Sequence, residues 1–121
     1  MKLTTKMIMI LLVVVLSGCN GATDYVIPIN SNLEFGRTNP STYSINYRDD
    51  GQFVIEPTIS EVNWDDSYVI AKREHNSDVE YWIIDLKDEV NYGPLSKEAY
   101  LKRKEKMNIE MELKSVDDIK P

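Results

Sequence analysis

The chain has 121 residues, which suits a single domain, and 42% of them are hydrophobic, which is ordinary for a globular protein. Its 20 acidic residues outnumber its 14 basic residues, so the formal net charge is −6 at pH 7. This balance argues against nucleic acid as a partner, because nucleic-acid binding needs clustered positive charge.

Residues 1–18 have the pattern of a signal peptide. Lys2 and Lys6 supply a positive start, residues 7–16 form an unbroken apolar run, and small residues follow. A run of this length is too short for a permanent membrane helix, which takes about 20 residues. We therefore expect a signal helix that is cleaved from the mature protein.

The tetrapeptide Leu16-Ser17-Gly18-Cys19 follows the apolar run and holds the only cysteine of the chain. It resembles the lipobox of bacterial lipoprotein precursors at every position. The resemblance implies a diacylglycerol on the Cys19 sulfur and cleavage between Gly18 and Cys19. A lone cysteine in an exported protein has no internal disulfide partner, and lipidation gives that thiol a use. Two acyl chains are about what stable membrane anchoring requires.

The lipobox predicts a lipid-anchored protein that faces outside the cytoplasm, on the cell membrane or the outer membrane. Two alternatives are an ordinary secretory signal peptide that ends near a cysteine and an uncleaved anchor helix. After cleavage, residues 19–24 are expected to form a short lipidated tether, and residues 25–121 a single globular domain. Loss of Lys2 and Lys6 makes the mature chain more acidic.

The domain begins with strand-like sequence. β-rich composition and alternating apolar residues predict strands at residues 25–27, 42–47, 52–56, 59–64, 68–72, 80–85 and 90–92. The last four lie at hairpin spacing, which predicts an antiparallel meander. Tyr81 and Ile83 alternate with Trp82 and Ile84, so both faces of that strand are apolar and we expect it to be central and covered.

A helix is predicted near the C-terminus. Ser96 can cap a helix from Lys97 to about Met107, which has no internal Gly or Pro. Residues 109–113 alternate apolar and acidic side chains and predict either a last strand or an extended tail. The expected fold class is α+β: a small antiparallel β-meander or sheet with one C-terminal helix.

Residues 59–109, ISEVNWDDSYVIAKREHNSDVEYWIIDLKDEVNYGPLSKEAYLKRKEKMNI, contain a Trp-Asp-Asp turn, the strand YWIID and the segment YGPLS before the helix. The segment LKSV follows at residues 113–116. After a lipobox, this order resembles an uncharacterised family of small bacterial lipoproteins, domain of unknown function 3997. The resemblance supports the expected fold and location and implies no activity, because the family has none assigned.

We predict no catalytic residue, cofactor or metal site. His75 is the only histidine and lies in a polar loop without a nucleophile motif, so we interpret it as a solvated turn residue. One histidine cannot supply a tetrahedral zinc site. Carboxylate pairs such as Asp49-Asp50 and Asp65-Asp66 sit at turns, where Asp bonds to nearby backbone amides, and none matches a calcium-loop motif.

Two features define a candidate interaction surface. Aromatic residues concentrate in the meander, where they either fill the core or anchor an interface. Basic residues concentrate in the helix, which either presents an ordinary solvated face or approaches anionic lipid headgroups. The candidate residues are Trp64, Tyr68, Lys102 and Arg103.

These patterns predict a membrane-anchored, noncatalytic accessory or binding module of the cell envelope. Its acidic domain would engage an envelope protein, which could be a cationic one. One alternative is an envelope glycan hydrolase, which needs two converging carboxylates about 5 to 9.5 Å apart. Another is an inhibitor or immunity-type lipoprotein, which is a subtype of the binding module.

Overall fold

The computed structural model describes residues 24–39 and 42–121, so the predicted signal helix, cleavage site and lipid tether up to Thr23 lie outside the described residues. The elements are β1 (Tyr25–Pro28), β2 (Leu33–Asn39), β3 (Thr42–Tyr47), β4 (Phe53–Ile55), β5 (Ile59–Trp64), β6 (Tyr68–His75), β7 (Asp78–Asp85), β8 (Val90–Leu95), α2 (Lys97–Lys106), β9 (Lys114–Ser115) and the short 3-10 helix η1 (Val116–Asp118). No helix in this part of the chain is long and apolar enough to cross a membrane.

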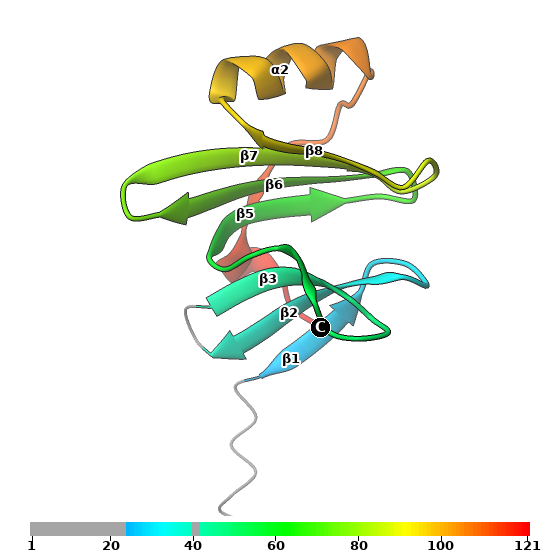
Figure 1. Ribbon diagram of the computed structural model, residues 1–121, viewed down its shortest axis with the longest axis vertical. Helices are drawn as coiled ribbons and strands as arrows, with labels where there is room; N and C mark the ends of the chain where they lie inside the picture. The colour runs from blue at the N-terminus through cyan, green and yellow to red at the C-terminus, as the bar shows by residue number, and fades with distance from the viewer. Residues whose placement is uncertain (1–23, 40–41) are drawn as a thin grey trace, which may run out of the picture.

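The strands form two sheets that, with the helix, make three layers (Figure 1). Sheet A has the order β1-β2-β3-β4, and sheet B has the order β8-β7-β6-β5-β9. Neighbouring strands are antiparallel throughout both sheets. In Figure 1 sheet A lies at the bottom, sheet B in the middle and α2 at the top. The predicted α+β class and the antiparallel meander from β5 to β8 are confirmed.

A hydrophobic core fills the space between the two sheets. Alternate residues of each strand point inward, as the two-residue period of a strand requires. Phe35 and Ile45 from sheet A meet Val62, Val69 and Ile84 from sheet B, and all five are fully or almost fully buried. This shared core joins the two sheets into one domain.

A second core lies on the opposite face of sheet B, under the helix. Ile70 and Ile83 from the sheet pack there with Tyr100 from α2, and the rings of Tyr81 and Tyr100 stack with centroids 4.9 Å apart. Burial raises the pKa of the Tyr100 phenol to about 12, because the charged phenolate is poorly solvated there. β7 thus has two covered faces, as its sequence predicted.

The ends of α2 match the sequence prediction closely. The Ser96 side chain accepts a hydrogen bond from the Ala99 amide at 3.1 Å and caps the helix. Lys104, near the last turn, is buried and pairs with Glu112 at 3.1 Å. Asn108 follows with φ 55°, a conformation that ends the helix and turns the chain back toward sheet B.

The structure corrects one part of the sequence prediction and decides another that was left open. β2 was not predicted, because Gly36 and the polar residues around it interrupt the apolar pattern, yet Leu33 and Phe35 point into the core. Residues 109–113 form the extended tail rather than a strand, and the last strand is the two-residue β9. Ile109 is buried under α2, so its side chain fills the helix-side core.

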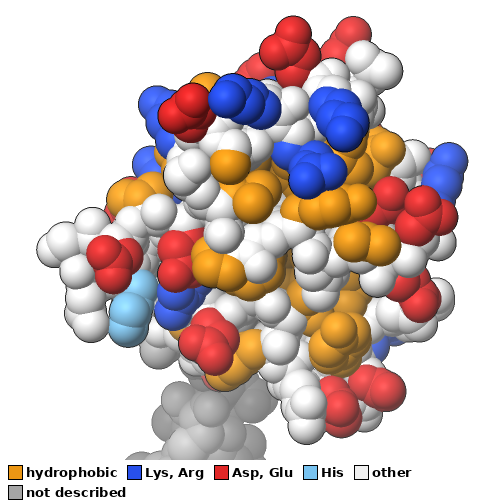
Figure 2. All heavy atoms as spheres, turned by 45° about the horizontal axis from the view of Figure 1, so that its top comes forward, with side chains coloured by type: hydrophobic (Ala, Val, Ile, Leu, Met, Phe, Trp, Pro, Cys, Tyr) orange, Lys and Arg blue, Asp and Glu red, His pale blue; other side chains and the backbone are white. Residues whose placement is uncertain are grey.

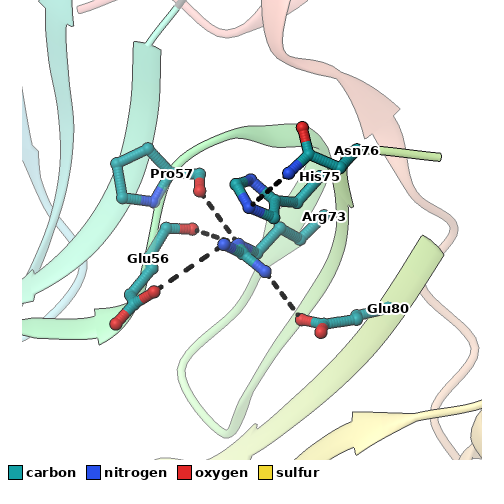
Figure 3. Close-up of polar contacts among 6 residues, drawn as sticks. All are labelled: Glu56, Pro57, Arg73, His75, Asn76 and Glu80. Atoms are coloured by element: carbon teal, nitrogen blue, oxygen red, sulfur yellow. Dashed lines mark hydrogen bonds and ion pairs between the residues drawn. The ribbon is translucent and has the colours of Figure 1, made fainter. Parts of the chain in front are cut away.

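Arg73 in β6 fastens the connection between the two sheets (Figure 3). The side chain is 10% exposed, and its Nε donates to the carbonyl oxygens of Glu56 and Pro57, both at 2.9 Å. These residues link β4 of sheet A to β5 of sheet B. Nη1 also pairs with Glu80 on β7 at 3.0 Å. One guanidinium therefore donates hydrogen bonds to the connection between the sheets and also pairs with the neighbouring strand.

Replacing Arg73 by Met should destabilise the domain. Met keeps an apolar side chain of similar length but leaves the Glu56 and Pro57 carbonyls without their donor, so we expect a loss of about 2–3 kcal/mol in the free energy of unfolding. Urea denaturation would measure it. Lys102→Ala, which removes only an exposed ion pair with Glu98, should cost less than about 0.5 kcal/mol. Equal losses in the two variants would contradict the role of Arg73.

Candidate functional site

A cleft opens at one end of the sandwich, between the β1–β2 loop of sheet A and the β7–β8 turn of sheet B. Its volume is about 340 Å³. The lining residues are Asn30, Ser31, Asn32, Leu33, Tyr47, Asp49, Ile84, Asp85, Leu86, Glu89 and Asn91. Three carboxylates, three amides and a tyrosine thus surround an apolar floor made by the ends of core strands.

Side-chain hydrogen bonds hold the sheet A wall of the cleft. The Asn30 Oδ1 accepts from the amides of Asn32 and Leu33, both at 2.8 Å, which shapes the β1–β2 loop. Arg48 donates to the Asn30 carbonyl at 2.8 Å. Asn32 then reaches across the cleft, where its Nδ2 donates to Glu89 Oε1 at 3.1 Å. This contact links residues 57 apart in sequence and joins the two sheets at the cleft.

Two of the cleft carboxylates accept hydrogen bonds from backbone amides of their own turns. Asp85 Oδ1 accepts from the amides of Lys87 and Asp88, both at 3.0 Å, and so builds the β7–β8 turn. Asp49 Oδ1 accepts from the Asp50 amide at 2.7 Å. These are the turn roles that the sequence predicted for Asp side chains.

The three cleft carboxylates, Asp49, Asp85 and Glu89, form no ion pair among the described residues, although Arg48 donates to the cleft residue Asn30. A cleft of this lining can accept hydrogen bonds and attract positive charge. The same part of the chain has no cluster of three or more His, Cys, Asp or Glu residues placed to hold a metal ion.

The predicted interaction residues do not form one surface. Trp64 packs against the Phe35 ring in the core between the sheets, with centroids 5.7 Å apart. Tyr68 lies on the opposite face of sheet B, at the helix-side core. Lys102 is exposed on α2, while the Arg103 guanidinium lies 4.5 Å from the ring centroid of Tyr92.

Tyr68, Lys102 and Arg103 therefore lie on the helix side of sheet B, and Trp64 lies on the other side. Figure 2 shows the helix side tilted forward, with basic and acidic side chains near the top and apolar side chains below them. The mixed charges belong to a solvated helix face. The other predicted site residues, Gly18 and Cys19, lie outside the described residues.

His75 lies at the end of β6, exposed to solvent (Figure 3). Its Nε2 is 3.2 Å from Asn76 Nδ2, and Asn76 and Ser77 form a tight turn with positive φ. This is the solvated turn histidine that the sequence predicted.

Sequence reasoning did not find the cleft. The sequence predicts a turn role for Asp49, but Asn30 and Asn32 carry no local motif. The polar run Asn30-Ser31-Asn32 was a usable turn signal. Nothing along the chain shows that this loop meets the β7–β8 turn, because that contact depends on how the sheets stack.

Two stacked sheets with a polar cleft at one end and one helix on the far face of sheet B define a small three-layer α+β domain. The family model for the protein of unknown function DUF3997 matches residues 30–117, which include β2 to β9 and every residue that lines the cleft. The chain therefore belongs to the DUF3997 family, as the sequence resemblance suggested. No curated protein and no solved structure matches it significantly.

The turn role of Asp85 can be tested with two substitutions. Asp85→Ala removes the acceptor of two backbone amides and should lower the free energy of unfolding by about 1–2 kcal/mol. Asp85→Asn keeps the Oδ1 acceptor and should cost less than about 0.5 kcal/mol. Urea denaturation of both variants is the measurement. If Asn were as damaging as Ala, the charge of Asp85 rather than its turn bonds would be what the fold requires.

Proposed function

We propose that this protein is a lipid-anchored, noncatalytic binding module of the bacterial cell envelope. The observation that carries the proposal is the Leu16-Ser17-Gly18-Cys19 tetrapeptide, which ends six residues before the first strand. Lipidation of Cys19 would hold the mature domain on the outer side of a membrane through two acyl chains.

The position of β1 supports this arrangement. Tyr25 begins an edge strand of sheet A, so a tether can join the domain there without crossing the core. Residues 19–24 span at most about 22 Å when fully extended. The lipid would therefore keep the domain close to the bilayer.

The cleft supports a binding role. Its carboxylates have no ion-pair partner among the described residues, so they favour a cationic group on an envelope protein. Tyr47 lines the cleft and is 40% exposed, which makes it a suitable aromatic contact at the mouth. An inhibitor or immunity-type lipoprotein would use the same cleft.

The alternative of a glycan hydrolase is favoured by one observation, the three carboxylates that line a single cleft. Such an enzyme would need one carboxyl group as acid and another as base or nucleophile. One carboxylate oxygen of Asp85 already accepts hydrogen bonds from two turn amides, which favours a structural role for that residue. Release of reducing ends from peptidoglycan by the purified protein would decide for the hydrolase.

The anchor predicts a mass difference. Intact protein from native membranes should begin at Cys19 and be heavier than its polypeptide by at least a diacylglycerol, and it should require detergent for extraction. Cys19→Ser should lack the added mass and the cleavage, because serine offers no thiol for the thioether. Mass spectrometry of both proteins is the measurement. An unmodified protein with another N-terminus would refute the anchor.

The binding role predicts a position-specific crosslink in living cells. A photoreactive amino acid at Tyr47 should give a discrete adduct, and one at Val79, which is 46% exposed on the β6–β7 hairpin away from the cleft, should not.

Adduct yield at Tyr47 should fall several-fold in the double variant Asp49→Asn/Glu89→Gln. It should persist in Glu105→Gln/Glu110→Gln, which makes the same charge change on exposed residues outside the cleft. Equal yields at Tyr47 and Val79 would contradict a cleft-bound partner.

A further inference from the structure

The outer face of sheet A is a distinct surface of the domain. The strand register places Val26 beside Gly36, Gly36 beside Ser44, and Asn46 beside Phe53. Gly36, Ser44 and Asn46 alternate with the core residues Phe35 and Ile45, so their side chains point away from sheet B. Val26 pairs with Gly36 on this face, and Phe53 pairs with Asn46 at a register shift in β3–β4.

This face carries an exposed apolar residue at each edge. Val26 on β1 is 52% exposed, and Phe53 on β4 is 53% exposed. Between them Gly36 has no side chain, and Ser44, which is 2% exposed, donates its hydroxyl to Asn46 Oδ1 at 2.9 Å. Glu34, the neighbour of Asn46 on β2, is the charged residue that the register places there.

The anchor attaches to the same sheet. β1, which carries Val26, begins six residues after Cys19, and sheet B and α2 both lie on the other side of sheet A (Figure 1). The tether therefore leaves the domain from the layer whose outer face is apolar at its edges. A short tether also keeps that face at high local concentration near the bilayer, so a weak apolar contact is enough to orient the domain.

We propose that the outer face of sheet A rests on the lipid headgroups of the membrane that holds the anchor, with Val26 and Phe53 as its apolar contacts. This inference rests on the lipidation of Cys19 in the proposed function. In this orientation the basic helix α2 lies two layers from the bilayer, on the order of 20 Å away. Its cations then face the aqueous side rather than the headgroups.

The test uses the full-length lipidated protein, in which Cys19 has no free thiol. Val26→Cys, Phe53→Cys and Leu101→Cys each introduce one thiol for an environment-sensitive fluorophore. Leu101 is the matched control, because it is 50% exposed but lies on α2 in the opposite layer. Each protein is reconstituted into phosphatidylcholine vesicles that contain a nitroxide-labelled lipid, and fluorescence quenching is measured.

Labels at positions 26 and 53 should be quenched several-fold more than the label at position 101. Equal quenching at the three positions in protein that floats with the vesicles would overturn the orientation and leave the anchor intact. Labels at 26 and 53 that escape the lipid quencher and are also shielded from aqueous iodide would show a protein segment on the face, which also overturns it. Protein that does not float with vesicles would instead refute the lipid anchor.

Discussion

The structure depends on one constraint, which is that sheet B is apolar on both faces. Along β6 and β7, Val69 and Ile84 point to one side while Ile70 and Ile83 point to the other, and all four are buried. A sheet of this kind needs a cover on each face. Sheet A covers one and α2 covers the other, so the three-layer order follows from the composition of two central strands.

Stacking two sheets brings distant loops together at the ends of the sandwich, and the polar features of the domain lie there. The Arg73 guanidinium donates hydrogen bonds to the carbonyls of the connection between the sheets, and Asn32 donates to Glu89 across the cleft. Arg73 is buried, and a buried polar group is costly unless it is paired, so its contacts also restrict how one sheet sits on the other. The cleft is thus a product of the same packing that forms the core.

The layer order also separates the proposed roles of the protein in space. The proposed lipid tether would join sheet A at β1, the carboxylate-lined cleft lies where loops of both sheets meet, and the helix forms the opposite layer. Loops carried on a rigid scaffold are a common place for binding residues. Because the DUF3997 family carries no assigned activity, these roles come from the residues of this chain.

The sequence by itself determined the features that depend on neighbouring residues: the meander of β5 to β8, the two-faced apolar pattern of β7 and the Ser96 cap of α2. It also contains the Cys19 motif, which is local. β2 escaped prediction because Gly36 and polar neighbours weaken its pattern, and only pairing with β1 and β3 makes it a strand. The cleft and the separation of Trp64 from Tyr68 were decided by tertiary structure alone, because side-chain alternation and sheet stacking place residues by face and not by distance along the chain.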